Sequence, residues 1–141
     1  MKSVVLLLLS FPLMTGCAFH HADSAQSRFS DTAERQQSES NHQADEYLDC
    51  VGSIDHKTAV ENYTDKNTRR EVVLESCREE ITRFTILQEQ AYDNTCRSSG
   101  KDATACDNEA VSKARHDTDV LLQKASERVD HTTAARRNYR Q

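Results

Sequence analysis

Cysteine is the residue type in this chain with the clearest chemical potential. The five cysteines are Cys17, Cys50, Cys77, Cys96 and Cys106. No two of them form a Cys-x-x-Cys pair, the spacing of thioredoxin-like redox sites and of the common zinc knuckles. The pattern therefore favours disulfides or the modification of a single thiol over metal binding or redox catalysis.

Other side chains offer little further chemistry. Ser98 and Lys101 match the S-x-x-K spacing in which a lysine activates a nucleophilic serine, but the S-D-N and K-T-G motifs that accompany it are missing. Adjacent His20 and His21 are the best candidates for a metal or small-ligand carrier. His116 is followed by Asp117, but consecutive residues of a helix point in different directions, so this pair does not predict a metal site. We therefore expect no catalytic residue, no metal site and no cofactor, and a protein that is not an enzyme.

The residues that would position these groups are strongly biased towards helix. The only proline is Pro12, and beyond residue 16 the only glycines are Gly52 and Gly100. A stretch with so few helix breakers and turn residues indicates an all-α protein.

Apolar spacing of three and four predicts three helices. The first starts at about Asn41, and the second follows a turn at residues 62–67 with Thr68-Arg69-Arg70-Glu71 as a capping box. The third follows a break at residues 97–102, with Asp102 as its cap. The second helix has the clearest apolar stripe, formed by Val73, Cys77, Ile81, Phe84, Leu87 and Ala91.

The helices restrict how four of the cysteines pair. Cys77 and Cys96 would lie about 28 Å apart on one helix, whereas a disulfide requires Cα atoms within roughly 7 Å. Cys77 and Cys96 therefore cannot pair, which also excludes the nested arrangement in which Cys50 would join Cys106. The midpoints of Cys50–Cys77 and Cys96–Cys106 fall in the two predicted turns, so we predict these two disulfides, each worth roughly 3 kcal/mol. The expected fold is an antiparallel three-helix hairpin bundle with coiled-coil packing, braced by both disulfides.

Residues 1–17 begin with Met1-Lys2, continue with a short apolar run and end in Met14-Thr15-Gly16-Cys17. The run is too short to span a bilayer. The last four residues resemble the lipobox of bacterial lipoproteins, although Met14 replaces the usual leucine. The resemblance implies cleavage before Cys17, with acylation of its sulfur and new amino group. Ala18 in place of aspartate is similar to lipoproteins sorted to the outer membrane.

The expected domain organisation has four parts. A signal peptide covers residues 1–16, the lipidated cysteine and a flexible tether residues 17–40, a helical domain residues 41–130, and a basic tail residues 131–141. The mature chain carries 17 basic and 23 acidic residues, a net charge of −6. This charge makes nucleic acid an unsuitable partner.

The function that fits these features is a non-enzymatic accessory or assembly factor, held on the periplasmic face of the outer membrane by its lipid and contacting an envelope protein. In size, helicity and anchoring the chain is similar to secretion pilotins and plasmid entry-exclusion lipoproteins. The alternative is an inhibitor of a cell-wall hydrolase such as lysozyme, acting through the disulfide-closed loop. In either case partner contacts are expected at Arg97, Ser98, Ser99 and Lys101, and for the accessory role also on the exposed faces of the second and third predicted helices.

Overall fold

The protein is built from helices. A computed structural model describes residues 18–60 and 65–139. Four helices follow one another: α1 (Ala18–Val60), α2 (Lys66–Ser76), α3 (Arg78–Ser98) and α4 (Ala103–Tyr139). These ranges contain no strand, so the predicted all-α class is confirmed. The predicted signal peptide and Cys17 lie outside the described residues.

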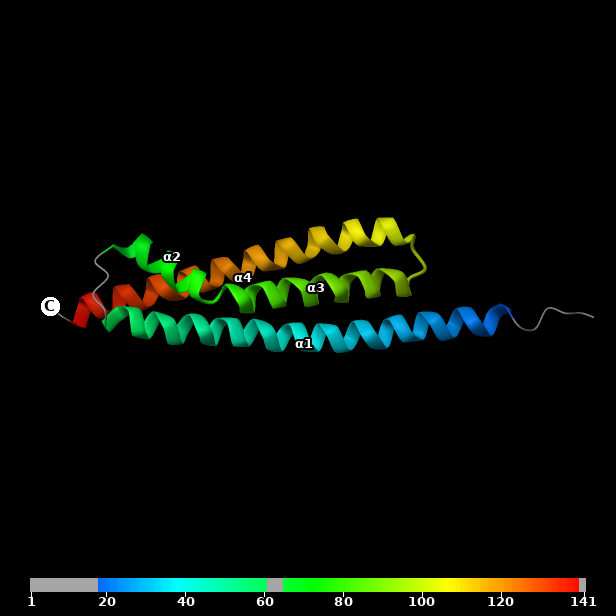
Figure 1. Cartoon of the computed structure of the whole chain (residues 1–141), viewed down its shortest axis with the longest axis horizontal. Coiled ribbons are helices and arrows are strands. Elements are labelled where there is room, and N and C mark those ends of the chain that lie inside the picture. The colour runs from blue at the N-terminus through cyan, green and yellow to red at the C-terminus, as the bar shows by residue number, and fades with distance from the viewer. Residues whose placement is uncertain (1–17, 61–64, 140–141) are drawn as a thin grey trace, which may run out of the picture.

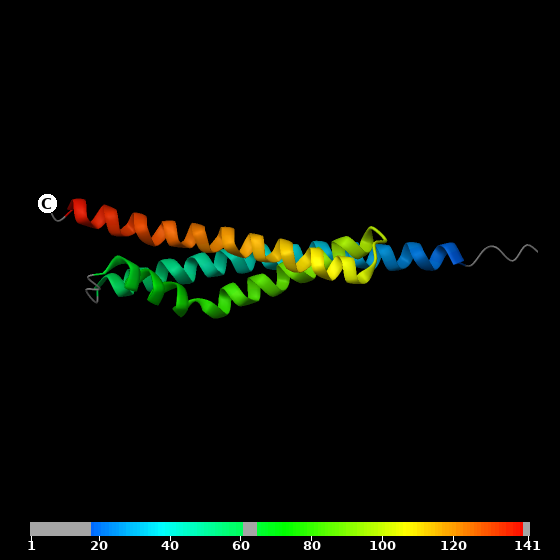
Figure 2. The same cartoon turned by 90° about the horizontal axis from the view of Figure 1, so that it is seen from above.

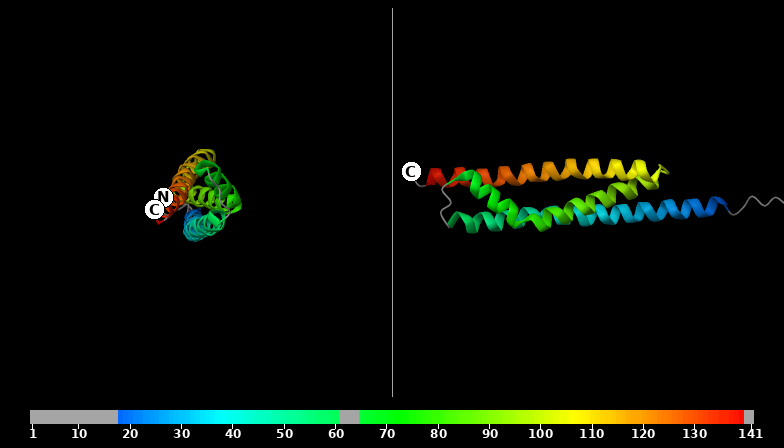
Figure 3. Two further views of the ribbon diagram at one scale, coloured as in Figure 1. Left: turned by 90° about the vertical axis from the view of Figure 1, so that its left-hand side faces the viewer. Right: turned by 45° about the horizontal axis from the view of Figure 1, so that its top comes forward.

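The helices form a long and narrow molecule. α1 runs along its length, α2 and α3 lead back beside it, and α4 reverses direction again (Figure 1). The first turns of α1 extend beyond the α3–α4 connection (Figure 2). Seen along the long axis, the helices gather side by side (Figure 3). The start of α1 and the end of α4 therefore lie at opposite ends of the molecule.

The predicted second helix is interrupted, which gives four helices where three were expected. Cys77 separates α2 from α3, and its N–H bonds to the Leu74 carbonyl at 3.2 Å, a bond three residues back instead of four. No proline or glycine occurs in either helix, so the local sequence does not demand a break. Cys77 is fully buried and joined to Cys50 of α1, and we attribute the break to these tertiary contacts.

The apolar core lies in the half of the bundle that contains this break. All four helices contribute to it, with fully buried Tyr47, Val51, Val73 and Val129 among its larger members. Phe84 of α3 and Leu121 of α4 belong to the same cluster. The core therefore holds the short α2 against the three longer helices.

The other half of the bundle is packed through small and polar side chains. Ala33 and Ser40 of α1 are buried here, although both fall in the segment expected to be a flexible tether. Gln36 donates to Gln90 of α3 at 3.0 Å, and Gln37 donates to Gln88 of α3 at 3.0 Å. The tether prediction is therefore wrong for the backbone from Ala18 onwards, because these contacts and the absence of breakers extend α1 beyond the apolar stripe.

Helix ends agree with the sequence in one case and differ in another. Asp102 caps α4 as predicted, accepting from the N–H groups of Thr104 and Ala105 at 2.9 and 3.2 Å. The N-cap of α2 is Asp65, which accepts from the Thr68 N–H at 2.8 Å and replaces the predicted capping box. The basic tail, expected to fray, is helical as far as Tyr139.

Two disulfides join the helices. They are Cys50–Cys77, with Cα atoms 6.0 Å apart, and Cys96–Cys106, with Cα atoms 5.4 Å apart. Both are the pairs expected from the sequence. The first ties α1 to the α2–α3 break, and the second closes the connection between α3 and α4.

Candidate functional site

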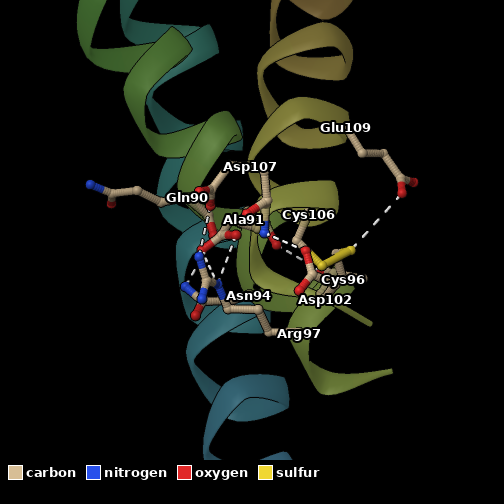
Figure 4. A network of polar contacts seen from close by, with 12 residues as sticks. Gln90, Ala91, Asn94, Cys96, Arg97, Asp102, Cys106, Asp107 and Glu109 are labelled. Atoms are coloured by element: carbon tan, nitrogen blue, oxygen red, sulfur yellow. Dashed lines mark hydrogen bonds and ion pairs between the residues drawn. A yellow bond between two sulfur atoms is a disulfide. The ribbon is translucent and has the colours of Figure 1, made fainter. Parts of the chain in front are cut away.

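The loop between α3 and α4, where partner contacts were expected, is tied to its own helices (Figure 4). The guanidinium of Arg97 bonds to Asp93 at 2.7 Å and to Asp107 at 2.7 Å. Lys101 Nζ lies 3.0 Å from Glu109, which also contacts Lys113 at 2.7 Å. The basic side chains of the loop are therefore already paired with carboxylates of the same chain.

These two lysines have a marked effect on Glu109. The hydrogen bond from Lys113, and then that from Lys101, lowers the pKa of Glu109 to about 2. The carboxylate therefore stays charged in all but strongly acidic solution, and it holds the loop to the first turns of α4.

The serines of the loop do not form a nucleophilic site. The hydroxyl of Ser98 donates to the Thr95 carbonyl at 2.7 Å, and that of Ser99 donates to the Cys96 carbonyl at 2.6 Å. Both hydroxyls thus complete the end of α3, and Lys101 bonds to Glu109 instead of to Ser98. Nothing in this geometry favours activation of a serine.

The same end of the bundle is connected to α1. Asn94 donates to Gln36 at 2.7 Å, and the Gln36 amide donates on to Gln90, so one α1 side chain joins two turns of α3. Gly100 has a φ of +77°, and the amide of Gln26 lies close to it. The predicted loop is thus packed on one side and exposed on the other.

A largely apolar hollow lies where α2, α3 and α4 meet, beside the break at Cys77. It has a volume of about 520 Å³. Half-buried Leu74, Ile81 and Leu122 form its apolar part. Glu75 and Arg78 at its edge pair with each other at 2.9 Å. We call this hollow the α2–α4 groove. An apolar centre with a charged edge is the usual composition of a protein-binding surface.

A second hollow, of about 570 Å³, is polar. Tyr92 and Gln88 of α3 both donate to the carboxylate of Asp117 on α4. The hydrogen bond to Asp117 raises the pKa of Tyr92 to about 12. The Lys113 ammonium lies 5.5 Å from the centre of the Tyr92 ring, and His116 also lines the hollow. These bonds join α3 to α4.

Two buried polar features stand out inside the bundle. Asp55 and Arg69 form an ion pair between α1 and α2, with side chains only 5% and 7% exposed. The hydroxyl of fully buried Tyr47 has no hydrogen-bond partner among the described residues, and burial raises its pKa to about 12. Both features lie in the apolar half of the bundle, and we interpret them as structural and not as parts of a functional site.

The described histidines do not belong to a cluster of metal-ligating side chains. No group of three or more His, Cys, Asp or Glu residues is placed to hold a metal ion in the part of the chain that the structure describes. The side chains of His20 and His21 lie outside the described ones. None of the described helices combines the length and the apolar character needed to cross a bilayer.

The comparisons with known proteins do not assign this protein to a family. No protein family, no curated protein and no solved structure matches this chain. The functional interpretation therefore depends on the residues and on the geometry described above.

The sequence analysis pointed to the exposed faces of the second and third predicted helices, but it did not identify the α2–α4 groove that lies between them. Its lining comes from three helices, and its shape depends on the break at Cys77. The one signal present was that Leu74 and Leu122 lie beside the main apolar stripes, where a narrow bundle does not bury them fully.

Proposed function

We propose that the protein is a non-enzymatic accessory lipoprotein of the bacterial outer membrane, anchored through Cys17 and acting by contact with an envelope protein. The observation that carries the proposal is the unbroken course of α1. This helix starts at the residue after Cys17 and continues to Val60 in the core half of the bundle. A lipid on Cys17 would thus sit at one tip of a long, narrow body.

We further infer that the working form is the antiparallel three-helix hairpin bundle, with α2 and α3 together acting as its middle helix. The two disulfides and the contacts of α3 with both α1 and α4 support this inference. A body of this kind suits the presentation of a surface, since the described residues supply paired polar groups and no reactive centre.

The surface we expect the partner to use is the α2–α4 groove. Leu74, Ile81 and Leu122 provide apolar contact area, and the charged edge would set the orientation of an amphipathic partner helix. The Arg97–Lys101 loop is the weaker candidate because its charges are already paired.

Anchoring is tested first, by labelling cells with radioactive palmitate and separating the two membranes. The native chain should be labelled and should fractionate with the outer membrane, whereas a Cys17→Ser variant should lose the label. Ala18→Asp should shift the protein to the inner membrane. An unlabelled native chain would contradict the proposal.

The contact surface is tested with a photocrosslinking amino acid at position 75, which lines the groove. The matched control is position 89, an exposed glutamate of α3 that does not line the groove. One defined envelope protein crosslinked from position 75 and not from position 89 supports the proposal. Equal crosslinking from both positions, or none from position 75, contradicts the use of the groove.

A further inference from the structure

The middle of the bundle is bowed at the break between α2 and α3. In Figure 2 these two helices bend away from α4 at the break, and in the right-hand view of Figure 3 the bend lies beside α1. Cys77 at the bend is joined to Cys50 of α1, with Cα atoms 6.0 Å apart. Leu74 and Ile81, on either side of Cys77, line the α2–α4 groove together with Leu122 of α4. The bend that brings Cys77 to α1 therefore also opens the groove.

Both ends of the α2–α3 segment are held by contacts other than this bridge. At the start of α2, Arg69 forms its buried ion pair with Asp55 of α1. At the end of α3, the Cys96–Cys106 disulfide joins the segment to α4. The Cys50–Cys77 disulfide is the covalent tie at the middle. The middle can therefore straighten while both ends stay in place.

The sequence across the break favours one continuous helix. Residues 66–98 contain neither proline nor glycine. Cys77 makes no side-chain cap hydrogen bond to α3. The backbone N–H groups of Arg78, Glu79 and Glu80 begin α3 and so lack helical carbonyls to bond. In a continuous helix they would bond to the carbonyls at the end of α2, so joining the two helices would satisfy these three groups.

Straightening would also bury apolar surface. Leu74 and Ile81 are seven residues apart, so they would share one face of a continuous helix. Both are half-buried, as is Leu122 across the groove. If the middle of the segment moves towards α4, the three side chains cover one another, and this burial stabilises the closed arrangement.

We propose that the Cys50–Cys77 disulfide is a redox switch for the α2–α4 groove. The oxidised chain keeps the groove open, and the reduced chain joins α2 and α3 into one helix and closes it. The inference rests on the proposed function for the use of the groove by a partner. Disulfides form in oxidising compartments outside the cytoplasm. The groove would thus open only after export, which limits partner binding to the exported chain.

The switching step is thiol–disulfide exchange with a dithiol reductant. A thiolate of the reductant attacks the half-buried Cys50 Sγ, and the fully buried Cys77 leaves as a thiolate and takes up a proton. The second thiol of the reductant then displaces Cys50 as a thiol, and the reductant ends as a disulfide. Two electrons and two protons pass to the cysteine pair. Cys96 and Cys106 are both buried, so their bridge should react more slowly.

The test is amide hydrogen exchange of the detergent-extracted full-length protein, followed residue by residue by NMR. The amides of interest are those of Arg78, Glu79 and Glu80. The test variant combines Cys50→Ser with Cys77→Ser, and the matched control combines Cys96→Ser with Cys106→Ser. Treating the control with dithiothreitol gives a second comparison, because it reduces the Cys50–Cys77 bridge without substituting it. Circular dichroism follows the helix content of every sample.

In the native chain and the untreated control, the three amides should exchange rapidly. In the test variant and the dithiothreitol-treated control they should exchange about tenfold more slowly, since each gains a helical hydrogen bond. Unchanged exchange in both reduced forms, or equal slowing in the untreated control, would overturn the proposal. Unfolding of both reduced forms would also overturn it, because a switch requires a folded reduced state.

Photocrosslinking from position 75 separates this proposal from the proposed function. The native chain and the Cys96→Ser, Cys106→Ser control should capture the same envelope protein, and the Cys50→Ser, Cys77→Ser variant should not. Slowed amide exchange without capture by the native chain refutes the partner and supports the switch. Capture by the native chain and by the test variant alike refutes the switch and leaves the partner.

Discussion

Gly52 offers a sharp test of how α4 is held against α1. A glycine inside a helix costs about 1 kcal/mol relative to alanine, so Gly52→Ala would stabilise α1 if space allowed. The space is occupied by Arg128. A Cβ atom at position 52 would lie 3.1 Å from Nη2 and 3.3 Å from Cζ of that side chain. The same guanidinium donates through Nη1 to the Leu48 carbonyl at 3.0 Å.

The two effects oppose each other, and their sizes decide the sign. Displacing the guanidinium weakens a charged hydrogen bond worth about 1.5–3 kcal/mol. We therefore expect Gly52→Ala to lower the free energy of unfolding by about 1 kcal/mol, the loss outweighing the gain in helix propensity. In an Arg128→Ala background the obstruction is gone, and Gly52→Ala should raise the free energy of unfolding by about 1 kcal/mol.

The assay is urea unfolding followed by far-ultraviolet circular dichroism, applied to the four members of the double-mutant cycle. Ser53→Ala is the control, because Ser53 is an exposed neighbour on α1. It should have the same small effect in both backgrounds. The reasoning is refuted if Gly52→Ala has the same effect with and without Arg128, since the two positions would then be independent.

Three further changes test other contacts. Asp55→Asn leaves the buried guanidinium of Arg69 without its carboxylate and should cost about 3–5 kcal/mol in unfolding free energy, whereas replacing both members by leucine and methionine should cost much less. Replacing Cys50 and Cys77 together by serine opens a loop with a sequence separation of 27 and should cost about 3.5 kcal/mol; an unchanged urea midpoint would argue against this brace. The lowered pKa of Glu109 means that its contribution to stability is complete above its unfolded pKa near 4.5 and is lost as the pH falls towards about 2. Glu109→Gln should flatten this part of the melting-temperature profile, and a profile as steep as that of the native chain would contradict the assignment.

Much of the architecture could be predicted from sequence because its determinants are local. The shortage of glycine and proline indicated helices, the apolar stripe located α3, and Asp102 was identified as a cap by its position alone. The cysteine pairs followed from helix length and turn position. Each of these inferences needed only residues close together in the chain or the fixed rise of a helix.

The features that escaped prediction depend on contacts between distant segments. The break at Cys77 has no local cause in the sequence, and the groove beside it follows from that break. The first half of α1 looked like a tether because its contacts use glutamine, serine and alanine instead of large apolar side chains. The role of Gly52 required knowledge of Arg128, 76 positions away.

The unequal packing of the two halves of the bundle has a consequence for its motions. The half with the α3–α4 loop is held by amide side chains, small residues and the Cys96–Cys106 bridge, while the larger apolar side chains gather in the other half. Local opening occurs most easily where the least apolar surface is buried. Backbone amides around Gln36 and Gln90 should therefore exchange with solvent through partial unfolding. Those around Val51 and Val129 should exchange only when the whole chain unfolds. The molecule is thus a body with a rigid end and a yielding end, and the yielding end is the one nearer the start of α1.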